Sequence, residues 1–191
     1  MDFAQKLNLT LFENNVHNIP TLASLLQSNI PFVVVGARAV NVYSDRPRNT
    51  LDIDVLTNHY KELADYVSAQ WPALTSRRSE AVIQFKLDQD TVLDIMIPYD
   101  ELLQTVLIDT KAVSGCEVAS AESLIVMKFA AIVGEHRPIH RKIIDRGDIA
   151  SILVANEIDM KKAKKLSSLL YPGSENDFVA FIYQLKKDLA Q

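Results

Sequence analysis

The stretch PFVVVGARAVNVYSDRPRNTLDIDVL, residues 31–56, decides the fold. It opens with the apolar, β-branched run 32–35, bounded by a proline and Gly36, which is typical of a buried strand. Gly36 allows a close turn, and residues 37–43 then fit a short helix whose first N–H groups point back over that turn. Residues 51–56 alternate carboxylates with aliphatic side chains, which indicates a second strand. The order strand, turn, helix, strand predicts an α/β domain.

Asp52 and Asp54 are the chemically informative residues of this stretch. Because side chains alternate along a strand, both project from one face, where they repel each other and resist burial. A divalent cation removes both problems, and Mg²⁺ is commonly held by one or two carboxylates together with substrate phosphates. The alternative is a solvated strand end, since so short a motif also occurs by chance.

The complete pattern resembles the signature of the DNA-polymerase-β-like nucleotidyltransferase superfamily. Gly36-Ala37 is followed by a helix and then by Arg48-Asn49-Thr50-Leu51-Asp52-Ile53-Asp54, matching a glycine turn and an Asp-x-Asp strand. The Arg-x-Thr-x-Asp-x-Asp form resembles the branch with abortive-infection-type nucleotidyltransferase toxins and small antibiotic nucleotidyltransferases. The likeness covers about residues 20–155. Ala37 departs from the Gly or Ser of the family, so a hydroxyl that would touch phosphate is missing.

This resemblance implies an NTP substrate, two Mg²⁺ ions and an acceptor of unidentified kind: a small molecule, tRNA or a protein. Asp52 and Asp54 are the implied metal ligands and catalytic residues. The implied nucleotide-binding residues are Gly36, Ala37, Arg38, Arg48, Thr50 and Lys128.

A third carboxylate is expected on a later strand. Residues 81–87 and 91–97 are predicted to form a hairpin, in which Asp94 is the only charge of the second strand. A charge in so apolar a run needs a partner. A salt bridge to Arg77 or Arg78 and a strand end in water are alternatives. Because Asp52 and Asp54 already suggest a metal site, Asp94 is predicted to be the third metal ligand or the general base.

Lys128 is the lone cation in the helix predicted for 121–133, which Ser120 caps. It either snorkels at the surface or, as the resembled branch implies, faces the triphosphate. The same likeness makes Asp145 a catalytic candidate that orients Lys128 or acts on the acceptor, with Arg141 and Lys142 of the basic loop His136–Lys142 near phosphate. The alternative is an exposed helix with charge pairs such as Arg141 with Asp145. The two histidines of the loop make only a weak zinc motif, because no second ligand pair follows.

Length and composition suit one domain with a helical appendage. The chain has 191 residues, 48% of them hydrophobic, and a net charge of −4, which gives no general case for nucleic acid. We expect a catalytic core over 1–115 and a helical subdomain over 116–191. One cysteine fits a reducing cytoplasm, and the N-terminus lacks the layout of a signal peptide. No apolar stretch is long enough to span a membrane.

Further helices are predicted near 7–13 and over 21–28, 60–70, 99–107, 160–170 and 175–189, with an edge strand near 111–113. Ser174 and Asp177 resemble a capping box for the last helix. The lysines of 161–165 form a basic face, which is most simply solvated; guidance of an RNA acceptor is the alternative.

The sequence therefore predicts an α+β nucleotidyltransferase fold: a short mixed sheet with flanking helices and a helical C-terminal part. The predicted activity is transfer of a nucleoside monophosphate from an NTP to an acceptor hydroxyl or phosphate, with release of pyrophosphate. Two other classes stay open: an inactive protein of this fold acting as a nucleotide sensor or with a cognate antitoxin, and a structural interaction protein.

Overall fold

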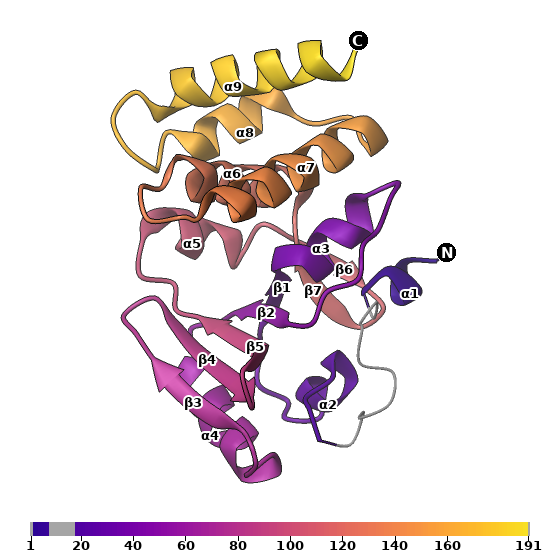
Figure 1. Ribbon diagram of the computed structural model, residues 1–191, viewed down its shortest axis with the longest axis vertical. Helices are drawn as coiled ribbons and strands as arrows, with labels where there is room; N and C mark the ends of the chain where they lie inside the picture. Colours follow the sequence, from indigo (N-terminus) through magenta and orange to yellow (C-terminus); the bar gives the residue numbers. More distant parts are fainter. Residues whose placement is uncertain (1, 8–17, 191) are drawn as a thin grey trace. The chain divides into compact units, whose positions relative to one another are not determined.

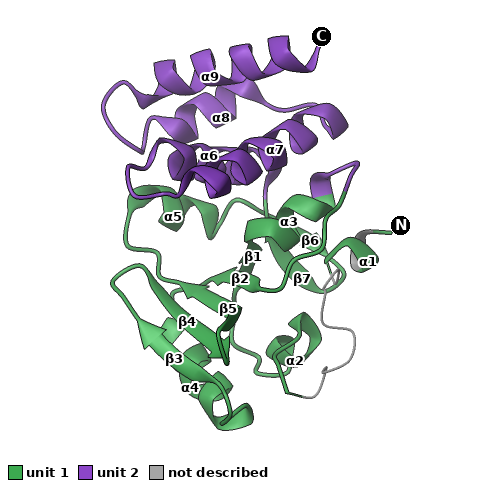
Figure 2. Ribbon diagram, viewed as in Figure 1, with its two compact units in different colours: residues 1–42, 47–119 green, residues 43–46, 120–191 purple. Residues whose placement is uncertain are grey.

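The computed structural model describes residues 2–7 and 18–190, which divide into two compact units. Unit 1 comprises residues 1–42 and 47–119, and unit 2 comprises residues 43–46 and 120–191 (Figure 2). The helix predicted near 7–13 falls almost entirely outside the described residues. The first described helix is instead α1, Phe3–Leu7.

Unit 1 is built on a mixed sheet of seven strands in the order β3-β4-β5-β2-β1-β7-β6 (Figure 1). β1 pairs antiparallel with β2 and parallel with β7, and β2 pairs parallel with β5. The mixed sheet confirms the predicted fold class. The strand bounds are β1 Val33–Val35, β2 Ile53–Leu56, β3 Thr75–Arg78, β4 Val82–Leu87, β5 Asp90–Met96, β6 Thr110–Val113 and β7 Cys116–Ala119.

Short helices flank this sheet. Their bounds are α2 Leu22–Leu26, α3 Gly36–Tyr43, α4 Tyr60–Gln70 and α5 Glu101–Val106. α4 lies against the face of the hairpin that carries the buried residues Ile83, Phe85, Leu93 and Ile95 (Figure 1). The opposite face of β5 carries Asp94. The apolar side chains therefore fix which face of the sheet presents the carboxylate.

Unit 2 is helical, as predicted. Ser120 caps α6, Ala121–Val133, through its side chain, and α7 Ile139–Ala155, α8 Met160–Ser167 and α9 Ser174–Leu189 follow. Phe129 of α6 meets Phe178 and Phe181 of α9, with ring centroids 5.3 and 5.4 Å apart. These aromatic contacts make an apolar core for the helices.

The structure differs from the sequence interpretation at three points. β3 and β7 were not predicted, and β7 moves the end of unit 1 from residue 115 to Ala119, because it pairs with β1. The predicted capping box at Ser174 is wrong: Gly173 is the N-cap of α9, and the buried Ser174 hydroxyl donates to the Ser167 carbonyl. Among the described residues, no helix is long and apolar enough to cross a membrane.

Candidate functional site

Three carboxylates meet on two paired strands of unit 1. Asp54 of β2 is directly opposite Asp94 of β5, and Asp52 immediately precedes β2. One oxygen from each of the three lies within 4.8 Å of the others, and each residue is partly exposed. We call Asp52, Asp54 and Asp94 the acidic triad. The parallel pairing of β2 with β5 brings together two residues forty positions apart in the sequence.

Gly36 is required by the position of Asp54. Gly36 is the first residue of α3 and has φ +62°, a left-handed conformation that glycine adopts without strain. A Cβ atom at this position would lie 1.8 Å from Oδ2 of Asp54. The backbone therefore passes against the carboxylate so closely that any side chain would displace it.

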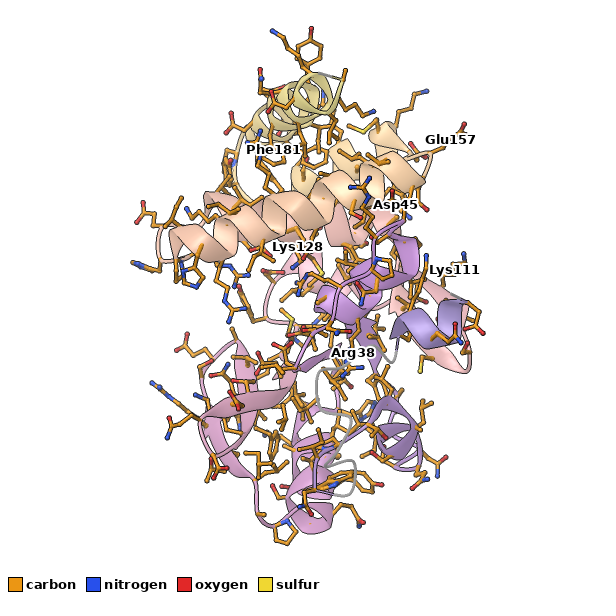
Figure 3. All side chains as sticks on the ribbon, turned by 45° about the vertical axis from the view of Figure 1, so that its right-hand side comes forward. Arg38, Asp45, Lys111, Lys128, Glu157 and Phe181 are labelled. Atoms are coloured by element: carbon orange, nitrogen blue, oxygen red, sulfur yellow. The ribbon has the colours of Figure 1, made fainter. Side chains whose placement is uncertain are left out.

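Asp52 is held by residues that the sequence interpretation assigned to nucleotide binding. Thr50 Oγ1 donates to Asp52 Oδ1 at 2.6 Å, and Arg38 Nε donates to the Asp52 carbonyl at 3.0 Å. Arg38 is buried and also donates to the Leu7 carbonyl (Figure 3). Burial lowers the pKa of Arg38, and the charges of Asp52 and Asp54 oppose that shift. Thr50 and Arg38 therefore position the acidic triad.

Asn41 was missed by sequence reasoning. It is almost completely buried; its Nδ2 donates to the Arg48 carbonyl at 2.8 Å, and its Oδ1 accepts from the Arg48 N–H at 2.9 Å. This pair of bonds fastens the loop before β2 to α3. The available signal was a polar residue between Val40 and Val42 in an apolar helix, where a buried amide needs partners.

The surroundings of Asp94 alter the acidity of its carboxyl group. Burial and, to a lesser degree, the charge of Asp52 raise its pKa to about 6, against the hydrogen bond from Gln84 and the charge of Lys86. Gln84 Nε2 lies 3.2 and 3.4 Å from the two carboxylate oxygens. Arg78 lies instead over the Tyr60 ring, 5.2 Å from its centroid. The predicted alternative, an arginine salt bridge, has no support among the contacts of the described residues.

The triad fits a hard divalent cation. Carboxylate oxygens are the donors that Mg²⁺ prefers, and three of them on one face are costly unless a cation neutralises them. Within the described residues, no other group of three or more His, Cys, Asp or Glu side chains comes close enough to hold a metal. His136 and His140 are exposed and belong to no such group.

Unit 2 contains a second set of charged residues, which we call the ion-pair cluster. Lys128 Nζ lies 2.7 Å from Asp145 Oδ1 and 2.8 Å from Asp148 Oδ2, and Arg137 Nη2 lies 2.7 Å from Asp145 Oδ2. Lys128 extends from α6 to the overlying α7 (Figure 3). Although burial opposes it, the charges of Asp148 and Asp145 raise the pKa of Lys128. The structure thus pairs Lys128 with Asp145, as predicted, and the partner arginine is Arg137 rather than Arg141.

Comparisons with known proteins agree with this fold. An antigenic nucleotidyltransferase-like protein from Paracoccidioides brasiliensis is 18% identical, with a TM-score of 0.56 over 88% of this chain and 86% of that one. The enzyme ANT(2″)-Ia, solved with adenylyl-2″-tobramycin, is 15% identical, with a TM-score of 0.50 over 85% and 95% of the two chains. At these identities the likeness shows the fold alone. No curated protein matches the sequence.

The family comparison goes further, because it spans most of the chain. The model of the family described as nucleotidyltransferase of unknown function, DUF6036, matches residues 14–187. The predicted resemblance to nucleotidyltransferases is thereby confirmed. Nucleotidyltransferases are transferases, and this chain belongs to the DUF6036 nucleotidyltransferase family.

Proposed function

We propose that the protein transfers a nucleoside monophosphate from an NTP to an acceptor hydroxyl, in a reaction that depends on Mg²⁺. The observation that carries this proposal is the acidic triad, whose ligand oxygens lie within 4.8 Å of one another beside the turn at Gly36. Family membership supports the reaction class. The NTP, the metal and the acceptor are our inference from the chemistry of the site.

The acceptor oxygen would form a bond to the α-phosphorus of the NTP. The bond from that phosphorus to the bridging oxygen of the β-phosphate would break, and pyrophosphate would leave. Asp94 would take the hydroxyl proton, a role that suits a carboxylate whose pKa is raised to about 6. The backbone N–H groups at the start of α3, at Gly36 and Ala37, would bind phosphate oxygens.

Asp52, Asp54 and Asp94 would hold the Mg²⁺ ions, two by analogy with related phosphoryl transfer chemistry. When bound, Mg²⁺ supplies charge neutralisation for the triphosphate. Thr50 and Arg38 would keep Asp52 in place for this role. Lys128 and Arg48 remain proposed phosphate ligands, and Asp145 a proposed positioning residue for Lys128, which it contacts at 2.7 Å.

A thermal-shift titration of each NTP, with and without Mg²⁺, tests the proposal. The wild type is compared with the double variant Asp52→Asn/Asp54→Asn and with the control Asp65→Asn, an exposed carboxylate of α4. A ligand that binds only the folded state stabilises it by about 2.7 kcal/mol at a hundredfold excess over its dissociation constant. We expect a shift that requires Mg²⁺ and both aspartates and is unaffected by Asp65→Asn.

Pyrophosphate release then separates the two functional classes. Release above background in the wild type supports an enzyme with turnover. A Mg²⁺-dependent shift without any release, across a range of acceptors, supports the nucleotide sensor, with Ala37 as the departure from the family pattern. The absence of a shift with every NTP contradicts the proposal and leaves an interaction protein or an antitoxin partner as the next hypothesis.

A further inference from the structure

A single row of side chains runs from the acidic triad to the edge of the sheet. Asp54 is opposite Asp94, Asp94 is opposite Gln84, and Gln84 is opposite Arg77, across strands β2, β5, β4 and β3. Directly paired residues project from the same face of a sheet. The four side chains therefore line one face, and the contact of Gln84 with both oxygens of Asp94 shows this directly.

The outer part of this row is exposed and positively charged. All four residues of β3 are exposed, and the side chain of Arg77 has no hydrogen bond or ion pair to any residue that the structure describes. Lys86, two residues beyond Gln84 on β4, is half-buried and close enough to Asp94 for their charges to interact. Two cations thus lie beyond the carboxylates, on the face opposite α4.

The neighbouring Arg78 is a natural reference for Arg77. It is equally exposed, but successive strand residues point to opposite faces, and its guanidinium lies over Tyr60 of α4. Arg78 and Arg77 therefore differ in face and not in charge or strand.

The charges of Arg77 in this row and of Lys86 beside it bear on which class of acceptor can bind here. An acceptor with its hydroxyl at Asp94 extends over Gln84 toward Arg77, which is about 10 Å away across two strand spacings. A polycationic acceptor would be repelled by Arg77 and Lys86, whereas phosphates would be attracted. A row of side chains that extends over β5 and β4 to the exposed β3 suits a polymer better than a small molecule, which is usually bound in a concave site.

We propose that this row binds the hydroxyl end of a single nucleic-acid strand, with Arg77 and Lys86 contacting its phosphates and Gln84 positioned beside the reacting end. The inference rests on the proposed function, because the strand is the acceptor in that reaction. Asp88 and Asp90 lie at the turn between β4 and β5, where their negative charges would repel phosphates of the strand and so limit how far it extends toward that turn.

Strand binding is measured by fluorescence anisotropy with the whole chain and a labelled single-stranded RNA of about twelve nucleotides. Arg77→Gln and Lys86→Gln are compared with Arg78→Gln and the wild type at salt concentrations from about 50 to 200 mM. Each lost phosphate contact should weaken binding about fivefold near 100 mM salt and make the slope of log K against log salt shallower by about 0.7. Arg78→Gln should match the wild type, and all variants should keep the wild-type melting temperature.

The Mg²⁺–NTP thermal shift keeps the two proposals apart. An intact shift with no strand binding, or with equal binding by Arg77→Gln and Arg78→Gln, overturns the acceptor inference and leaves the nucleotidyl transfer standing. Arg77-dependent binding of adenosine 5′-monophosphate without strand binding also overturns it, in favour of a small phosphorylated acceptor. A missing NTP shift is instead a failure of the proposed function.

Discussion

The acidic triad of unit 1 and the ion-pair cluster of unit 2 use aspartate in opposite ways. In the cluster, two buried carboxylates meet two cations, and Lys128 and Arg137 contact them at 2.7–2.8 Å. In the triad, three carboxylates lie together, and the Nε and Nη1 atoms of the neighbouring Arg38 donate to main-chain carbonyls. The cluster alternates carboxylates with cations, whereas the triad gathers three carboxylates in one place.

This contrast separates carboxylates that pair with cations of the protein from carboxylates that lie against one another. Buried carboxylates with matched partners stabilise packing only while the pair stays complete. Carboxylates held close together repel each other, which costs free energy in the folded protein, and such sites are frequently functional. The following predictions test that distinction, from the largest expected effect to the smallest.

Gly36→Ala should have the largest effect on the triad. The new Cβ would lie 1.8 Å from Asp54 Oδ2, and φ is +62°, so the variant has both a steric clash and backbone strain. We expect a loss of at least about a hundredfold in activity, since misplacing a reacting group by 1 Å can cost that much. Pyrophosphate release and the Mg²⁺-dependent thermal shift measure it.

Gly115→Ala is the matched control. Gly115 has φ +83° and no atom within 4 Å of an added Cβ, so its substitution introduces strain without a clash. It should cost about 1–2 kcal/mol in unfolding free energy and leave the Mg²⁺-dependent shift intact. Equal loss of that shift in both variants would contradict a specific contact between Gly36 and Asp54.

Lys128→Met should destabilise the ion-pair cluster. It leaves Asp145 and Asp148 buried, with Arg137 still paired to Asp145, and removal of one member of a buried ion pair typically costs about 3–5 kcal/mol. Urea unfolding of the metal-free protein measures the change in unfolding free energy.

Lys162→Met provides the comparison for Lys128. Lys162 pairs with Glu122 at 3.3 Å, and its side chain is 36% exposed, so the loss should be no more than about 1 kcal/mol. A similar small loss for Lys128→Met would mean that the cluster contributes little to stability, and the contrast between the two regions would fail.

Asp94→Asn should act in the opposite direction to Lys128→Met. Burial and the charge of Asp52 raise the pKa of Asp94 from 3.8 to about 6, so ionisation of this carboxyl destabilises the folded state. Its penalty is absent below pH 3.8, grows as the pH rises, and is complete above about 6; two pKa units correspond to about 3 kcal/mol at most.

Urea unfolding without Mg²⁺ at several pH values measures this penalty. From pH about 4 to about 7.5 the wild type should lose stability relative to Asp94→Asn, by about 1–3 kcal/mol. Mg²⁺ should stabilise the wild type more above pH 6 than below it, and should have little effect on the variant. Parallel stability curves for the two proteins would show that Asp94 ionises without cost.

The sequence was most informative where a pattern is local. The run 32–56 predicted the strand, turn, helix and strand in order, and the isolated charge of Asp94 in an apolar strand indicated the third carboxylate. β3 was missed because Thr75–Arg78 is polar throughout and fully exposed, so its conformation depends on pairing with β4. Strand pairing between distant segments leaves little trace in the sequence of either one.

The residues that support the site were harder to predict than the triad itself. Asn41 looks like an ordinary helix residue, and its role follows from the return of the chain to Arg48. Arg137 lies in the loop before α7 and contacts Asp145 from there, whereas helix spacing pointed only to Arg141 as an alternative partner. The need for glycine at position 36 depends on the register of β1 with β2, which places Asp54 opposite Val35.

Thr50→Val is the mildest test of the triad. Thr50 Oγ1 donates to Asp52 Oδ1 at 2.6 Å, and valine keeps the shape while removing the donor. A lost hydrogen bond to a charged group costs about 1.5–3 kcal/mol, so pyrophosphate release should fall by about tenfold or more. Thr50→Ser keeps the hydroxyl and should retain most of the activity.

The response of Thr50→Val to Mg²⁺ tests the contrast between the triad and the ion-pair cluster further. If Thr50 positions Asp52 for metal binding, Thr50→Val should lower the Mg²⁺ affinity seen in the thermal shift, and high Mg²⁺ should restore part of the activity. The ion-pair cluster supplies no ligand to Mg²⁺ of the triad, so no Mg²⁺ concentration should restore the stability lost in Lys128→Met. Rescue of neither variant would indicate that Thr50 only stabilises the fold, as the cluster does, because a purely structural hydrogen bond does not respond to a ligand of the triad.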